Sequence, residues 1–144
     1  MIVLDANILI YAHMPKMKEH RMAAHWLEIT LSSGGEGVGI MWQVATAFLR
    51  LTTNQRIFDD ALDIETATLY LDNLLSHPLV RKIGPTDRHW EVYRNLLSDN
   101  DIVADLVMDT RIVAVAIEHN ASIASSDRHF RRFSQHVKVI NPLK

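Results

Sequence analysis

Short apolar runs alternate with amphipathic segments along the whole chain. The apolar runs predict buried strands at residues 1–4, 38–41, 80–83, 121–125 and 137–140. Apolar residues that recur at helical spacing predict helices at residues 8–12, 20–31, 43–51, 64–75, 87–97 and 110–119. Strands separated by helices in this way favour a mostly parallel central sheet flanked by helices, an α/β fold.

The chain has 144 residues, a length that suits one domain with a substantial buried core. A Gly-rich loop at residues 32–37 is too short to separate two domains, so we expect a single domain over residues 1–144. Trp42 and Trp90 are expected to pack in that core, although either ring could instead stack on an unpaired base.

Composition excludes several classes of protein. The sequence contains no cysteine, so neither a disulfide framework nor a thiolate metal site is possible. It also contains no apolar run of membrane-spanning length and no secretory signal, so we expect a cytoplasmic protein. The formal charge of −2 means that binding of a nucleic acid would depend on a local basic patch.

Three acidic residues follow or face the ends of predicted strands. Asp5 and Asp127 come directly after apolar runs, and Asp109 stands where an apolar helix is expected to open. Each alone has a structural interpretation, as a helix cap or a turn residue. In a parallel sheet, however, ligands gather at the carboxyl ends of the strands, and this edge is where the fold would bring the three carboxylates together.

Clustered carboxylates repel one another and need either a raised pKa or a cation. Mg²⁺ and Mn²⁺ prefer oxygen ligands, and such an ion activates water and neutralises charge on a phosphodiester. Ser126, beside Asp127, is either a hydroxyl that contacts this site or a simple turn residue.

The motifs IVLDANILIYA, MWQVATAFLRLTTNQRIF, VMDTRIVAVAIEHNASIASSDRHFRRF and VKVINPL together resemble the PIN-domain ribonucleases, specifically VapC-type toxins of bacterial toxin–antitoxin pairs. The resemblance covers nearly the whole chain, and its specificity lies in the order and spacing of the pieces. It implies a single PIN-like domain that acts as a metal-dependent endoribonuclease with Mg²⁺ or Mn²⁺. It further implies cleavage of single-stranded RNA to 5′-phosphate and 3′-hydroxyl ends, a VapB-like antitoxin partner and a homodimer.

The resemblance also assigns roles to individual positions. Asp5, Asp109 and Asp127 match the metal-binding acids of the family. Asn7 matches the polar residue that supports the first acid, and Ser126 matches the hydroxyl residue before the last.

Two positions depart from the family pattern. Ala47 stands where the family often has a glutamate, and His129 stands where a further acid is frequent. The imidazole of His129 is still able to bind a metal or a phosphate, and Arg128 beside it is placed to hold an RNA phosphate. These departures leave open a weakened PIN module that binds RNA or an antitoxin without cutting. A phosphatase with an aspartyl nucleophile at Asp5 is a more distant alternative, because Asn7 stands where that chemistry commonly has a second acid.

Overall fold

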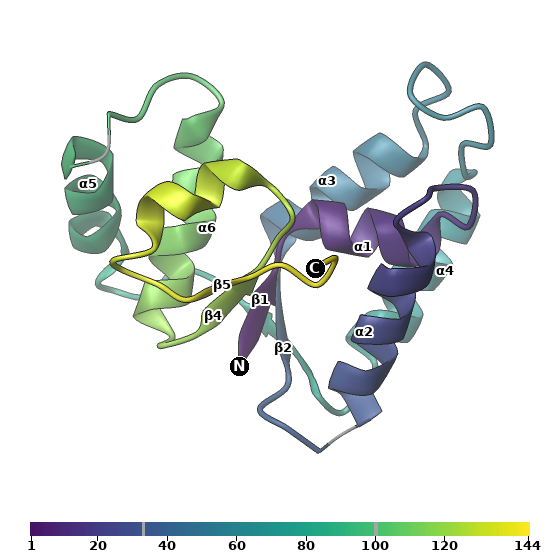
Figure 1. Ribbon diagram of the computed structural model, residues 1–144, viewed down its shortest axis with the longest axis horizontal. Helices are drawn as coiled ribbons and strands as arrows, with labels where there is room; N and C mark the ends of the chain where they lie inside the picture. The colour runs from purple at the N-terminus through teal and green to yellow at the C-terminus, as the bar shows by residue number, and fades with distance from the viewer. Residues whose placement is uncertain (33, 100) are drawn as a thin grey trace.

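The computed structural model describes residues 1–32, 34–99 and 101–144. At its centre lies a five-stranded sheet in which every strand is parallel to its neighbours (Figure 1). The strands are β1 (Ile2–Leu4), β2 (Val38–Met41), β3 (Val80–Ile83), β4 (Ser122–Ala124) and β5 (Val139–Ile140). Their order across the sheet is β3-β2-β1-β4-β5. The expected α/β fold with a mostly parallel sheet is confirmed.

Helices cover both faces of this sheet. They are α1 (Ala6–His13), α2 (His20–Ser32), α3 (Trp42–Thr52), α4 (Ile64–Leu75), α5 (His89–Asp99), α6 (Leu106–Glu118) and the 3-10 helix η1 (Arg128–Phe133). In Figure 1, α1 to α4 lie on one side of the strands, and α5 and α6 lie on the other. Parallel strands are joined by crossovers, which place helices on the faces, so both faces of the sheet are buried.

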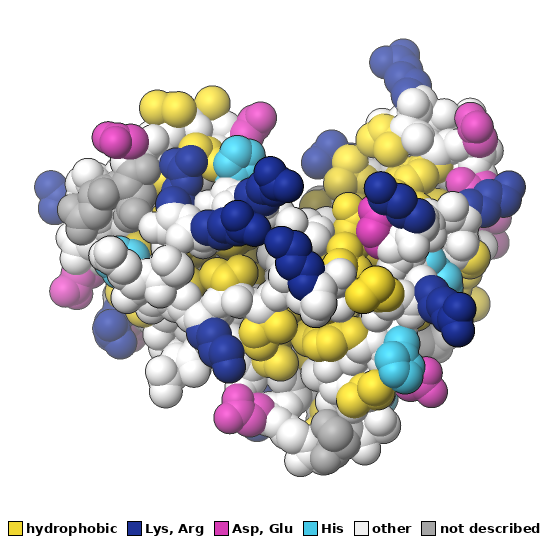
Figure 2. Space-filling view, viewed as in Figure 1, with side chains coloured by type: hydrophobic (Ala, Val, Ile, Leu, Met, Phe, Trp, Pro, Cys, Tyr) yellow, Lys and Arg dark blue, Asp and Glu magenta, His cyan; other side chains and the backbone are white. Residues whose placement is uncertain are grey.

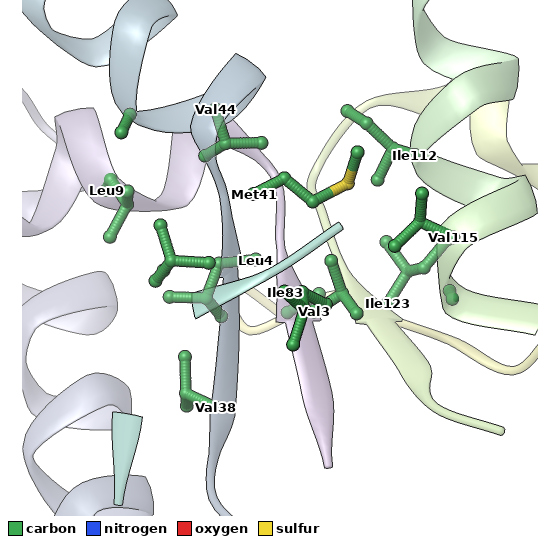
Figure 3. Packing of buried hydrophobic residues seen from close by; sticks show 14 of the residues in the cluster. Val3, Leu4, Leu9, Val38, Met41, Val44, Ile83, Ile112, Val115 and Ile123 are labelled. Atoms are coloured by element: carbon green, nitrogen blue, oxygen red, sulfur yellow. The ribbon is translucent and has the colours of Figure 1, made fainter. Parts of the chain in front are cut away.

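The core lies on both faces of the inner strands. Figure 3 shows Leu4 and Leu9 on the α1 side of β1, and Ile112 and Val115 of α6 on the opposite side. All four side chains are fully or almost fully buried, as the apolar runs of the sequence require.

The carboxyl ends of β1 and β4 lie side by side at the centre of the sheet. Leu4 pairs with Ala124, and the backbone N–H of Asp5 donates to the Ala124 carbonyl across 3.0 Å. Asp5 and Ser125, the residues that follow these strands, therefore leave the sheet at the same point. This pairing is what positions the site described below.

Two expectations from the sequence are wrong in detail. Helix α6 begins at Leu106, so Asp109 lies in its first turn and does not open it. Trp42 and Trp90 are 59% and 66% exposed and do not pack in the core. Helix α6 is followed by Asn120, which has a φ of 53°, the left-handed conformation that ends many helices. No helix in the described part of the chain has the length and apolar character needed to cross a membrane.

Candidate active site

Each carboxylate oxygen of Asp5 accepts a hydrogen bond. It is the N-cap of α1, and its Oδ1 accepts a hydrogen bond of 2.8 Å from the backbone N–H of Ala6. Its Oδ2 accepts a hydrogen bond of 2.7 Å from the hydroxyl of Ser125. Burial raises the pKa of Asp5, the two hydrogen bonds oppose that rise, and the charge of Asp127 adds to it. The capping role and a role in the site are therefore compatible.

Ser125 connects the three polar residues at this end of the sheet. Ser125 is 2% exposed, and its single hydroxyl proton is directed to Asp5. Ser125 Oγ must therefore accept its other two contacts, from the backbone N–H of Asp127 at 3.0 Å and from Asn7 Nδ2 at 3.4 Å. This fixes the amide of Asn7 with its nitrogen toward Ser125, and the buried Oδ1 is left with no partner.

Asp127 precedes η1 and lies three residues after the end of β4. Its Oδ1 accepts a hydrogen bond of 2.9 Å from the backbone N–H of His129, which makes it the N-cap of this 3-10 helix. The side chain of His129 is exposed, and its positive charge lowers the pKa of Asp109, so the imidazole lies near that acid.

Asp109 differs from the other two acids because no side chain or backbone group of the described residues donates to its carboxylate. Burial and the charges of Asp5 and Asp127 raise the pKa of Asp109 to about 6. Asp105, one turn earlier, is exposed and adds a smaller repulsion. The fold thus brings the three predicted acids near enough to one another for their charges to interact.

A cavity of about 450 Å³ opens between α3 and α6 beside these acids. Asp5 and Asp109 line it together with Gln43 and Ala47 of α3. Gln43 Nε2 donates a hydrogen bond of 2.9 Å to the carbonyl of Met108, the residue before Asp109. The helix that carries Asp109 is therefore attached to α3 at the mouth of the cavity.

A family model described as the PIN domain matches residues 2–135. The chain belongs to the PIN-domain family. Two curated relatives of this PIN domain are ribonucleases of Mycobacterium tuberculosis. VapC43 is 35% identical over 133 residues, which is 92% of this chain and 90% of the relative, and VapC37 is 36% identical over 92% of each chain.

Solved structures show the same fold at low sequence identity. VapBC2 from Rickettsia felis, bound to a DNA fragment from its promoter, superimposes with a TM-score of 0.71 at 20% identity, over 98% of each chain. VapC20 of Mycobacterium tuberculosis, described as a toxin that cleaves the sarcin–ricin loop, superimposes with a TM-score of 0.68 at 17% identity, over 98% of this chain and all of that chain. Such similarity supports the fold alone.

The donors of this PIN domain suit a hard divalent cation. They are oxygen atoms, two of the three carboxyl groups have raised pKa values, and Asn7 Oδ1 and Gln43 Oε1 are buried without partners. No three acidic or imidazole side chains of the described chain are grouped closely enough to hold one ion by themselves. Mg²⁺ does not require this, because it usually keeps several waters and binds through one or two carboxylates. The residues present therefore fit such an ion.

A second cavity, of about 540 Å³, borders the site along η1 and the C-terminal segment. Its charged lining consists of Asp127 and four cationic side chains, which are those of Arg128, Arg131, Lys138 and Lys144. We call this cavity the basic groove. Figure 2 shows Lys and Arg side chains gathered over this part of the face. Ser126 lines the groove and is partly buried, with its role as a site hydroxyl still a prediction.

The structure brings the three predicted acids together and places beside them two residues that the sequence did not single out. The hydroxyl that contacts Asp5 belongs to Ser125, the neighbour of the predicted Ser126. Gln43 was also missed, although it lies one helical turn before Ala47 and thus on the same face of α3. That spacing was the available clue.

Proposed function

We propose that this PIN domain is an endoribonuclease that hydrolyses RNA phosphodiester bonds with Mg²⁺ or Mn²⁺. The observation that carries the proposal is the position of Asp5, Asp109 and Asp127, gathered at the carboxyl ends of β1 and β4 and beside a cavity of about 450 Å³. Relatives that match nine-tenths of the chain are named ribonucleases, which favours the same chemistry here.

Asp5 and Asp109 would hold the cation, with Asp127 close to both. When bound, the ion would lower the pKa of a coordinated water and neutralise charge on the scissile phosphate. Asp5 is ready to bind because Ser125 and the start of α1 already fix both of its oxygens. Asp109 would lose its proton on binding, since the cation favours the ionised carboxyl group.

The basic groove is proposed to hold the RNA backbone next to the cleaved bond. Arg128 and Arg131 are exposed on η1, directly after Asp127, and Lys138 and Lys144 complete the charged wall. Such contacts to phosphates position a strand without reading its sequence. The groove gives a chain of net charge −2 the local positive patch that RNA binding requires.

An antitoxin and a second copy of the chain are the proposed protein partners. Structural neighbours include VapBC complexes and a toxin–antitoxin complex from Klebsiella pneumoniae, which favours a VapB-like partner for this PIN domain. Trp42, Val107 and Met108 are exposed apolar residues at the starts of α3 and α6. Contiguous exposed apolar side chains often mark interfaces, and we assign this surface to the homodimer.

The test is cleavage of RNA by the purified chain without antitoxin. Single-stranded RNA should be cut in Mg²⁺ or Mn²⁺ to products with 5′-phosphate ends, and excess EDTA should abolish the cutting. Asp5→Asn keeps an oxygen that can cap α1 and should remove cleavage while the fold is retained. Equal cleavage by the wild type and by Asp5→Asn would contradict the assignment.

The same experiment decides the alternative of a module that binds without cutting. Ala47 in place of a glutamate and the absence of a tight three-residue cluster in the described chain are the observations that favour it. Tight RNA binding by a well-folded wild type that leaves the RNA intact in either metal ion would support that alternative.

A further inference from the structure

The amide oxygens of Asn7 and Gln43 share an unusual property. Across the residues that the structure describes, they are the buried side-chain oxygen or nitrogen atoms without a hydrogen-bond partner. Leaving such an atom unsatisfied costs about 1–3 kcal/mol, and native proteins normally avoid the cost with a water or an ion. Both atoms belong to the active-site end of the sheet, Asn7 through Ser125 and Gln43 through the cavity beside Asp5 and Asp109.

The orientation of the Gln43 amide follows from hydrogen-bond chemistry. Its nitrogen lies 2.9 Å from the carbonyl oxygen of Met108, which is able only to accept. Rotating the amide by half a turn would place two acceptor oxygens against each other. The oxygen of Gln43 is therefore fixed on the opposite side of the amide, away from Met108.

Gln43 shares a cavity with two of the three acids. Gln43 and Ala47 stand one turn apart on α3 and line the same cavity as Asp5 and Asp109. Ala47 has no polar side-chain atom, so Gln43 is the residue of this pair that carries an acceptor oxygen at the cavity wall. A neutral amide oxygen is an established ligand of hard cations and adds no further repulsion among the three acids.

We infer that Gln43, through its Oε1, contributes an oxygen to the divalent cation bound at Asp5 and Asp109. The inference rests on the proposed metal-dependent function and adds one neutral residue to the three acids of the site. The second orphaned oxygen, on Asn7, belongs to the residue that Ser125 connects to Asp5, so another neutral acceptor lies near one of the proposed metal ligands.

Titration of the purified full chain with Mn²⁺ in a calorimeter tests this inference. Gln43→Met is unbranched and of similar length but has no acceptor oxygen, and it should weaken Mn²⁺ binding by about 10-fold. Gln43→Glu replaces the amide with a carboxylate and should bind Mn²⁺ several-fold more tightly. The ion should also raise the melting temperature of Gln43→Glu more than that of the wild type.

Gln43→Glu separates this role from a purely structural one. Neither methionine nor a carboxylate is able to donate to the Met108 carbonyl. If Gln43 served only to attach α6 to α3, both variant proteins would therefore bind Mn²⁺ more weakly than the wild type. That result, or unchanged affinity in both, would overturn the inference. Gln55→Leu, at an exposed glutamine outside the cavity, is the matched control and should leave Mn²⁺ affinity unchanged.

The behaviour of the wild type distinguishes failure of the Gln43 inference from failure of the proposed function. A wild type that binds Mn²⁺ and cuts RNA while Gln43→Met does both equally well would remove Gln43 from the site and leave the proposed function intact. A folded wild type that does not bind Mn²⁺ would overturn the metal dependence of the proposed function and this inference with it.

Discussion

The two sides of the active site are built differently. On the sheet side, Asp5 accepts two hydrogen bonds, and Ser125 ties it to Asn7 and to the backbone of Asp127. On the helix side, no donor of the described residues reaches the carboxylate of Asp109, and burial with like charge raises its pKa to about 6. The sheet side is organised before any ligand arrives, whereas the ionised carboxylate on the helix side lacks such support and would gain most from the proposed cation.

This difference shows how a parallel sheet supports such a site. The strand ends supply fixed positions through backbone pairing, because β1 and β4 are adjacent and in register. The carboxyl group on α6 is attached less directly, through the Gln43 contact to Met108. Under the proposed function, a rigid half and a cation-dependent half together would allow the ion to be bound and exchanged.

The largest expected effect comes from removing charge on either side. Asp5→Asn and Asp109→Asn should each reduce RNA cleavage by about 1000-fold, equivalent to about 4 kcal/mol of transition-state stabilisation. Asp127→Asn should cost less, because Asp127 already uses one oxygen to cap η1. Initial rates on one RNA oligonucleotide at saturating Mg²⁺ measure this order. A larger loss for Asp127→Asn than for Asp109→Asn would contradict the proposed division of roles.

The second effect isolates the rigid half. Ser125→Ala removes the hydroxyl that serves Asp5, Asn7 and the Asp127 backbone, so it should lower the free energy of unfolding by about 1–3 kcal/mol. It should also slow cleavage by about 10-fold or more, because Asp5 loses its positioning partner. Denaturant unfolding curves and cleavage rates provide the two measurements.

Ser126→Ala is the matched control for this change. No side-chain hydrogen bond of Ser126 is found in the described chain, and its removal should change stability by no more than about 0.5 kcal/mol. Similar losses in both serine variants would mean that the Ser125 network does not stabilise the site.

The smallest effect concerns the cation-dependent half and has a defined pH dependence. The carboxyl group of Asp109 titrates at about 6 in the fold, above its ordinary value of 3.8, so the folded state binds the proton more tightly than the unfolded state. In the absence of a cation, this residue therefore costs stability as the pH rises from about 4 through 6, and the cost is complete above that range. Asp109→Asn should be more stable than the wild type at pH 8, by about 1 kcal/mol once solvent screening of a partly exposed group is allowed for.

Thermal unfolding in EDTA at pH 4 and pH 8 checks this prediction. The difference in melting temperature between Asp109→Asn and the wild type should be small at pH 4 and clear at pH 8. A difference of equal size at both pH values would show that the ionisation of Asp109 does not cause it.

Much of the architecture was predictable because the responsible interactions are local. Apolar runs identify the strands, and acids directly after them identify the edge where ligands gather, which places Asp5 and Asp127 correctly in the fold. The choice between Ser125 and Ser126 was not predictable, because neighbouring residues at a strand end point in opposite directions and the phase is set by the sheet. The start of α6 at Leu106 was missed because aspartate is a common helix cap, which suggested that the helix begins at Asp109. In the structure, the three residues before Asp109 are already helical.

The exposure of Trp42 and Trp90 could not be predicted from the sequence, for a different reason. Apolar aromatic residues favour burial, but a residue on a helix is buried only if its face meets another element. Both tryptophans lie near the starts of helices on faces that this single chain leaves uncovered. Gln43 was missed because a glutamine is ordinary on a helix, and its spacing from Ala47 does not show that its amide oxygen is buried without a partner.

The release of protons on binding of Mn²⁺ tests the central claim most directly. Because Asp109 has a pKa of about 6, roughly half of its carboxyl groups carry a proton at pH 6, and a cation bound there should displace it. Calorimetric titrations in two buffers with different ionisation enthalpies should give at least about half a proton released per ion at pH 6 and almost none at pH 8. Asp109→Asn should lower the release at pH 6. Binding of Mn²⁺ with the same proton release at both pH values, unchanged in Asp109→Asn, would contradict a cation site at this carboxyl group.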